Sequence, residues 1–119
     1  MIKIARLIKS FQYAIRGLVK VFREEQNLRV QTLAGIFAFV LAWYFQVTAV
    51  EWCLLIIVSA LVLLMEIVNS AIERVADVLK PRIHTYVKEV KDIMAAAVML
   101  ASGLAIVVGL IIFLPRLFT

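Results

Sequence analysis

The sequence predicts an all-α integral membrane protein that forms a single domain over residues 1–119. Of these 119 residues, 65% are hydrophobic and only 18% are charged. Soluble domains average about 45–50% apolar and about 25% charged residues. Residues 30–50 and 93–115 also contain no Asp, Glu, Lys or Arg. Each run is long enough to cross the roughly 30 Å hydrocarbon core as a helix.

Residues 1–29 are expected to form a cytoplasmic amphipathic helix on the membrane surface. Apolar residues recur at steps of three and four and so define one stripe. Basic residues lie beside this stripe, which suits an anionic leaflet, but a topological signal alone would require the same charges. The apolar positions are Ile4, Leu7, Ile8, Phe11, Ile15, Leu18 and Phe22, and the basic ones are Lys3, Arg6, Lys9, Arg16, Lys20 and Arg23.

Three transmembrane helices are predicted to follow, at residues 30–50, 52–73 and 93–114. The second has a shorter charge-free run, which ends at Met65 and is followed by Glu66. The apolar pattern nevertheless continues through Ile67, Val68 and Ile72. We therefore expect this helix to continue past Glu66 and to carry polar groups at its end.

The distribution of Lys and Arg predicts the orientation of these helices. Seven precede the first span, five lie between the second and third, none lies in the link at 46–51, and Arg116 is alone near the C-terminus. Cytoplasmic segments carry the excess of basic residues. We therefore expect a cytoplasmic N-terminus, a cytoplasmic second connection and an external C-terminus in the cell membrane.

Several common functional classes are excluded. The single cysteine, Cys53, permits neither a disulfide framework nor a multi-thiolate metal site within one chain. The four glycines are too far apart for a Walker A or G-x-G-x-x-G loop. No nucleic-acid motif accompanies the net charge of +5, so no nucleic-acid partner is expected. The single histidine, His84, is interpreted as a solvated loop residue or as a phosphate contact.

The most informative residues are Glu66, Asn69, Glu73 and Asp77. On a helix they fall within an arc of about 80°. Ionisable groups at membrane depth are costly and usually face a protein interior, a watery cavity or a functional site. Hydrogen bonding between helices is the alternative role for Asn69. Neighbouring carboxylates repel each other unless a proton or cation intervenes, and such oxygen ligands suit Mg²⁺.

Two other polar clusters are expected at the same membrane interface. Glu24 and Glu25 lie where the surface helix meets the first span, while Lys91 and Asp92 lie just before the third. Together with Arg6, these residues could provide a metal site, charge compensation for phosphate and a base. Phosphoryl transfer requires this combination, because positioning and electrostatics supply most of its catalysis.

Three motifs then carry a family resemblance. They are E-x-x-N-S-A-I-E-x-x-x-D at 66–77, K-D-x-x-A-x-A-V at 91–98 and E-E-x-N-x-R at 24–29. With them the sequence resembles the small integral-membrane lipid kinases of bacteria, the diacylglycerol kinase and undecaprenol kinase family. The resemblance covers nearly the whole chain and implies a homotrimer with ATP and Mg²⁺ at the cytoplasmic interface.

The resemblance also implies roles for individual residues. Glu66 would be the general base, oriented by Asn69. Glu25 and Glu73 would hold the metal, and Asp77 would support the site. The implied nucleotide-binding residues are Arg6, Tyr13, Glu25, Glu73, Arg82, His84, Lys91 and Asp92, and the implied substrate-binding residues are Arg6, Glu66 and Ala95.

Undecaprenol is the expected acceptor, with diacylglycerol as the alternative. The family's proteobacterial diacylglycerol kinases tend to have an acid where this chain has Gln31 and an arginine where it has Val78. Two other functions compete with a kinase. A transporter would need polar groups at several membrane depths, whereas the acids cluster at one. A membrane adaptor that only binds anionic lipid would leave the acidic stripe unexplained.

Overall fold

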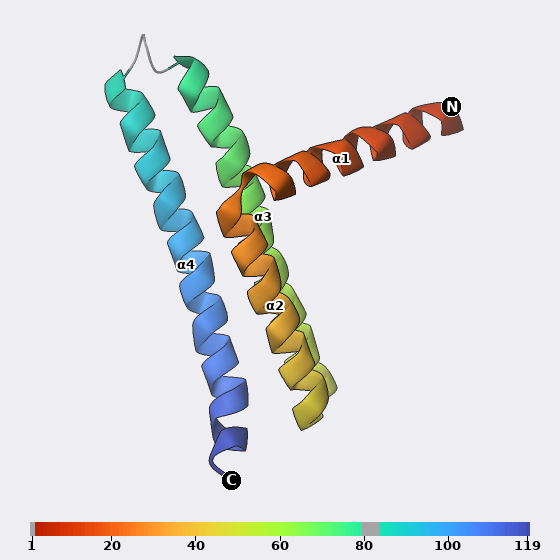
Figure 1. Cartoon of the computed structure of the whole chain (residues 1–119), viewed down its shortest axis with the longest axis vertical. Helices are drawn as coiled ribbons and strands as arrows, with labels where there is room; N and C mark the ends of the chain where they lie inside the picture. The colour runs from red at the N-terminus through yellow and green to blue at the C-terminus, as the bar shows by residue number, and fades with distance from the viewer. Residues whose placement is uncertain (1, 80–83) are drawn as a thin grey trace.

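The computed structural model describes residues 2–79 and 84–119, without the side chain of His84. These residues form four helices and no strand (Figure 1). The helices are α1 (Ile4–Glu24), α2 (Gln26–Phe45), α3 (Ala49–Leu79) and α4 (His84–Leu117). The last three are long and apolar enough to cross a membrane. The predicted all-α architecture, with one amphipathic helix and three apolar ones, is therefore confirmed.

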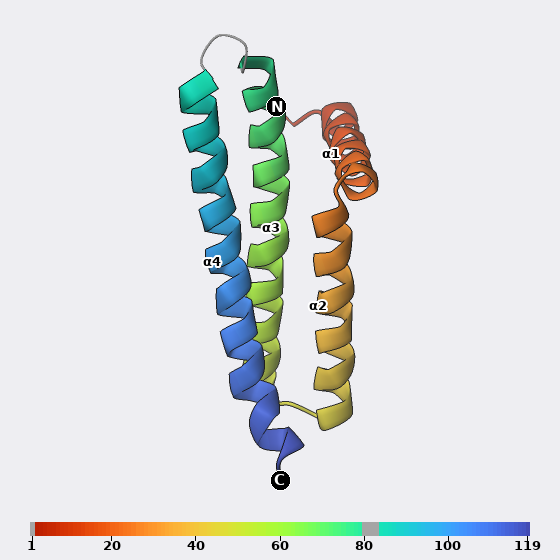
Figure 2. The same ribbon diagram turned by 60° about the vertical axis from the view of Figure 1, so that its left-hand side comes forward.

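The N-terminal helix α1 projects from the bundle formed by the other three (Figures 1 and 2). None of its residues is buried. The break between α1 and α2 is the single extended residue Glu25, with φ −103° and ψ 109°. Arg29 of α2 donates hydrogen bonds to the carbonyl oxygens of Phe22 and Arg23 at 3.1 and 2.5 Å. These bonds satisfy carbonyls that the end of α1 would otherwise leave without a partner.

In the bundle, α3 lies between α2 and α4 and contacts both (Figure 2). Its buried positions include Leu55, Val58, Val62, Glu66 and Ser70. Steps of three and four residues keep these side chains on one face of the helix. Glu66 and Ser70 therefore continue the same buried stripe that begins with leucine and valine.

Helices α3 and α4 run past the spans expected from charge-free sequence, whereas α2 ends at Phe45, before the expected end at residue 50, because the chain turns at Gln46. α3 continues to Leu79 and α4 begins at His84, whereas the expected spans end at residue 73 and begin at residue 93. A charge-free run marks the part of a helix that suits hydrocarbon. Polar residues can continue the same helix at the interface, where water satisfies their side chains.

One end of the bundle, here called the aromatic end, contains the turn between α2 and α3 and the C-terminus. Thr48 and Glu51 form a capping box, with Thr48 N donating to Glu51 Oε1 at 2.9 Å and Glu51 N donating to Thr48 Oγ1 at 3.2 Å. Arg116 donates to both Glu51 carboxylate oxygens at 2.9 and 2.7 Å. This bidentate pair joins the start of α3 to the end of α4.

Apolar packing reinforces the aromatic end. Ala42, Leu55 and Phe113 belong to one cluster of buried residues from α2, α3 and α4. The rings of Phe45 and Phe113 lie 6.3 Å apart between centroids, within the range of favourable aromatic pairs. The three helices are therefore packed together at the end that lies away from the predicted site.

Candidate active site at the polar end of the bundle

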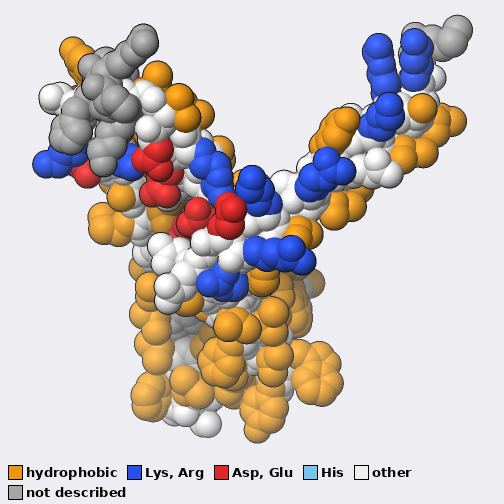
Figure 3. All heavy atoms as spheres, turned by 45° about the horizontal axis from the view of Figure 1, so that its top comes forward, with side chains coloured by type: hydrophobic (Ala, Val, Ile, Leu, Met, Phe, Trp, Pro, Cys, Tyr) orange, Lys and Arg blue, Asp and Glu red, His pale blue; other side chains and the backbone are white. Residues whose placement is uncertain are grey.

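The opposite end, here called the polar end, is where α1 meets the bundle and where α3 ends and α4 begins. Figure 3 shows that Asp and Glu side chains gather there, between the bundle and the basic side chains of α1. The visible face of the bundle beyond this point is largely hydrophobic. The structure thus concentrates the polar groups at one end, as the sequence predicted.

Glu66 is the most enclosed acid of this group. Its residue is only 7% exposed, in a helix that is otherwise apolar at this depth. Glu25 and Glu73 lie close enough for their charges to act on its carboxyl group. Three acids from two parts of the chain therefore share one region, where a bound cation would relieve their mutual repulsion.

Two neighbours on α3 hold the flanking carboxylates. Asn69 Nδ2 donates to Glu73 Oε1 at 3.4 Å, and Ser70 Oγ donates to Glu25 Oε1 at 3.0 Å. The second bond connects the break between α1 and α2 to α3, the central helix of the bundle. The amide of Asn69 thus contacts Glu73, whereas the resemblance had implied that it orients Glu66.

Helix α4 contacts the acidic stripe through Lys91. Lys91 Nζ donates to Asp77 Oδ1 at 2.6 Å, which joins α3 and α4. Asp92 and Ala95 are exposed on α4. Among Lys91, Asp92 and Ala95, Lys91 is therefore the residue with a hydrogen bond to the acidic stripe.

Two predicted site residues of α1, Tyr13 and Arg6, lie at different distances from the bundle. Tyr13 lines a cavity of about 440 Å³ together with Ile67, Ala71 and Arg74 of α3. Arg6 lies in the part of α1 that projects furthest from the bundle (Figure 1). Within this one subunit, Tyr13 lies beside α3 and Arg6 extends away from it.

Two further predicted residues lie at the connection between α3 and α4. Arg82 lies outside the described residues, and His84 begins α4 but its side chain is not described. Their predicted role at the nucleotide stays a prediction.

Sequence analysis missed the contributions of Ser70 and Arg74. Ser70 is 1% exposed and bonded to Glu25. Arg74 contacts both Glu24 and Glu25. A signal was present, since each residue follows the preceding polar one by a single helical turn: Glu66, Ser70, Arg74. Arg74 had been counted only as a determinant of orientation.

The carboxylates near Glu66 can be compared with the ligand sets that metal ions require. Within residues 2–79 and 84–119, no group of three or more His, Cys, Asp and Glu side chains could hold a metal ion. Mg²⁺ needs fewer protein ligands, because it usually binds one or two carboxylates together with phosphate oxygens and water. Glu25 and Glu73, both near Glu66, match this smaller ligand set.

Comparison with known proteins identifies the family of the chain. Residues 12–113 match the family described as prokaryotic diacylglycerol kinase. The chain belongs to this family. It is an integral-membrane lipid kinase that crosses the bilayer several times, and ATP is the phosphoryl donor that such a kinase uses.

Individual relatives of the kinase differ in their named substrates. The chain is 30% identical to the undecaprenol kinase of Bacillus subtilis over 94% of its length and 91% of that protein. It is 34% identical to a diacylglycerol kinase of Synechocystis, covering 93% of this chain and 64% of the relative. It is 35% identical to the diacylglycerol kinase of Escherichia coli K12 over 86% and 84% of the two chains.

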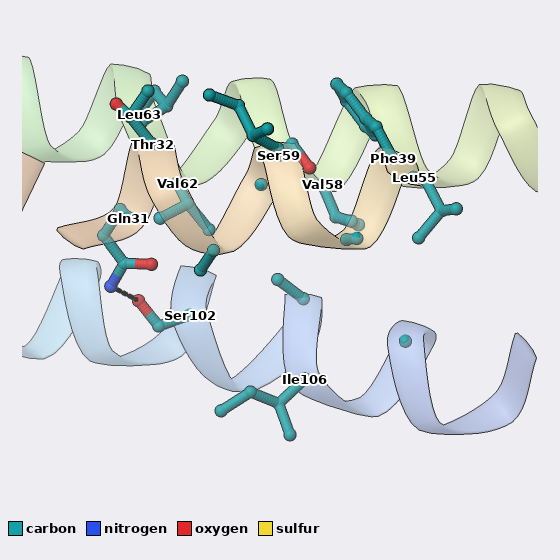
Figure 4. Close-up of a pocket in the computed structure, with 16 residues that line it drawn as sticks. Gln31, Thr32, Phe39, Leu55, Val58, Ser59, Val62, Leu63, Ser102 and Ile106 are labelled. Carbon is teal, nitrogen blue, oxygen red and sulfur yellow. Dashed lines mark hydrogen bonds between the residues drawn. The ribbon is translucent and has the colours of Figure 1, made fainter. Parts of the chain in front are cut away.

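A groove of about 360 Å³ runs along the kinase between α2 and α4, with α3 as its floor (Figure 4). Its lining is mainly apolar and includes Val62 and Leu63, which lie within one helical turn of Glu66. Gln31 of α2 and Ser102 of α4 point toward each other across it, with Nε2 donating to Oγ at 3.5 Å. The groove thus follows the spans at a short distance from the buried acid.

Proposed function

We propose that this kinase transfers the γ-phosphoryl group of ATP to undecaprenol, in a Mg²⁺-dependent reaction at the polar end. The observation that carries the proposal is the position of Glu66, a buried acid within one turn of an apolar groove between the spans. A lipid alcohol has the matching form, with one hydroxyl group above a long apolar tail. The tail would occupy the groove and the hydroxyl would meet Glu66.

In the proposed reaction, Glu66 is the general base. The lipid oxygen attacks the γ-phosphorus and forms the new P–O bond while its proton passes to the Glu66 carboxylate. The bond between the γ-phosphorus and the bridging oxygen breaks, and ADP leaves. A side chain held within hydrogen-bond reach of the hydroxyl is what this proton transfer requires.

Glu25 and Glu73 would hold Mg²⁺, which neutralises charge on the phosphate oxygens when it is bound. The hydrogen bonds from Ser70 to Glu25 and from Asn69 to Glu73 support this assignment, because they fix one oxygen of each carboxylate. Asn69 then contributes by positioning Glu73. Ligand carboxylates are commonly oriented by such neighbouring donors.

The remaining predicted contacts are assigned to the nucleotide and the lipid. Lys91, fixed by Asp77 at the edge of the stripe, supplies positive charge near the phosphates. Asp77 supports the site through this pair. Arg6, Tyr13, Arg82, His84 and Asp92 complete the proposed nucleotide contacts, and Arg6 and Ala95 those of the lipid.

We further propose that the active enzyme is a homotrimer with a cytoplasmic N-terminus. Arg6 lies near the start of α1, and the projection of this helix away from its own bundle supports a site shared between subunits (Figure 1). The excess of Lys and Arg at the polar end supports its location in the cytoplasm, where ATP is available. The C-terminus, at the aromatic end, would be external.

Undecaprenol is preferred over diacylglycerol because of the groove's chemistry. The esters of diacylglycerol place carbonyl oxygens just below the hydroxyl, whereas a polyprenol has only hydrocarbon there. Gln31 and Ser102 bond to each other and leave the rest of the lining mainly apolar. Such a lining favours hydrocarbon, since an unpaired polar group costs free energy there.

The test is the transfer of label from [γ-³²P]ATP to undecaprenol and to diacylglycerol, each supplied in mixed micelles with purified protein. We expect both lipids to be labelled and undecaprenol to be labelled faster. Faster labelling of diacylglycerol would reverse the proposed preference. If neither lipid were labelled, the proposed reaction would be contradicted.

A further inference from the structure

Arg74 contacts both acids at the break between α1 and α2. Its Nη2 forms an ion pair and hydrogen bond with Glu24 Oε2, and its Nη1 lies 3.7 Å from Glu25 Oε1. Nη1 also donates to the carbonyl oxygen of Ser70 at 3.2 Å and to its hydroxyl Oγ. One guanidinium group from α3 thus lies near two consecutive carboxylates, one at the end of α1 and one at the break that follows it.

The two carboxylates are held by different donors. Glu24 accepts a hydrogen bond from Arg74, whereas the hydrogen bond to Glu25 comes from the neutral hydroxyl of Ser70 at 3.0 Å. A guanidinium group carries a full charge and competes with a metal ion for a carboxylate, whereas a hydroxyl adds no charge. Arg74 therefore approaches Glu25 only at 3.7 Å, and the hydrogen bond that Glu25 accepts comes from a neutral group.

We propose that Glu24 is a positioning residue that retains Arg74 and so leaves Glu25 available to a divalent cation. The inference rests on the proposed role of Glu25 as a metal ligand. It assigns no metal contact to Glu24 itself. Its effect on the metal passes through Arg74, whose other acidic neighbour is Glu25.

Loss of Glu24 therefore has a consequence that depends on Arg74. In Glu24→Gln the guanidinium group loses its charged hydrogen-bond acceptor, and the carboxylate 3.7 Å away becomes its remaining acidic partner. In Glu24→Gln with Arg74→Gln the competitor is also absent. If Glu24→Gln acted only by changing the net charge, it would weaken cation binding equally with and without Arg74. The double variant therefore distinguishes this charge effect from an effect that passes through Arg74.

The experiment measures Mn²⁺ binding to the full chain in detergent micelles, by the electron paramagnetic resonance signal of free Mn²⁺, with and without a non-hydrolysable ATP analogue. The variants are Glu24→Gln, Arg74→Gln and the double variant. Glu89→Gln, which removes an exposed acid from α4, is the matched control. Glu25→Ala tests the metal site itself.

We expect Glu24→Gln to raise the Mn²⁺ dissociation constant about three- to fivefold, the range set by a partly exposed ion pair. In the Arg74→Gln background the same substitution should change it by less than about 1.5-fold. Equal weakening in both backgrounds, or none in either, would overturn the proposal. Unchanged Mn²⁺ affinity in Glu25→Ala would instead overturn the metal role of Glu25, and that result is read independently of Glu24.

Discussion

The two ends of the bundle use charged residues in opposite ways. At the aromatic end, Glu51 is paired with Arg116 through two hydrogen bonds and its other contacts belong to a helix cap. At the polar end, Glu25 and Glu73 lie close to the buried Glu66. The aromatic end thus pairs one acid with one base, whereas the polar end brings three acids close together.

The two ends also differ in how closely their side chains are packed. The aromatic end is filled by a buried cluster that includes Ala42 and Phe113. The polar end has a cavity between α1 and α3, and α1 contributes no buried residue. Stability is thus concentrated at one end of the helices, which leaves the other free to retain crowded carboxylates that would be unfavourable for folding alone.

The largest expected effect is loss of the acid at the centre of the polar end. Glu66→Gln keeps the volume of the side chain but cannot accept the hydroxyl proton, so turnover should fall about 10²- to 10⁴-fold. Assembly and melting temperature should be retained, since an amide replaces a carboxyl group among other acids. Kinase assays paired with thermal melts in detergent measure both, and full activity would exclude Glu66 as the base.

A smaller effect is expected from an acid at the edge of the same group. Glu73→Gln removes a proposed ligand charge and leaves Asn69 without its carboxylate acceptor. The Mg²⁺ concentration for half-maximal activity should rise about tenfold, as for loss of a group that supports a metal site. Titration of activity with Mg²⁺ provides the measurement, with Glu89→Gln as control. An unchanged Mg²⁺ requirement would remove Glu73 from the site.

The aromatic end should respond in stability and not in catalysis. Arg116→Gln leaves Glu51 without its bidentate partner, so the melting temperature should fall by a few degrees while activity stays within about twofold. Replacing both partners, as in Glu51→Gln with Arg116→Gln, should restore part of the loss. A large fall in activity at unchanged melting temperature would contradict the separation of the two ends.

The smallest effect is expected in the groove that connects the two ends. Ser102→Ala leaves the amide of Gln31 without its partner, and a polar amide then faces the lipid tail. The ratio of undecaprenol to diacylglycerol phosphorylation should fall about two- to fivefold, because a free amide can bond an ester carbonyl. Competition assays with both lipids measure this ratio. Gln31→Leu should leave the ratio at or above that of the unaltered chain.

The sequence predicted those parts of the kinase that depend on periodicity. Charge-free runs located the three apolar helices, and the spacing of Glu66, Asn69 and Glu73 placed them on one helical face. Periodicity does not reveal what lies opposite that face. The contacts of Arg74 with Glu24 and of Ser70 with Glu25 join residues 45 to 50 positions apart, so they depend on how α1 and α2 are placed against α3.

The turn between α2 and α3 has a consequence for how the protein enters its membrane. Gln46 adopts a left-handed conformation at φ 50°, and α3 begins only three residues later, at Ala49. Gln46, Val47 and Thr48 carry no charge. A short uncharged turn of this kind suits insertion of the first two spans as a single helical hairpin. The contact between Arg116 and Glu51 then requires that α4 pack against α3.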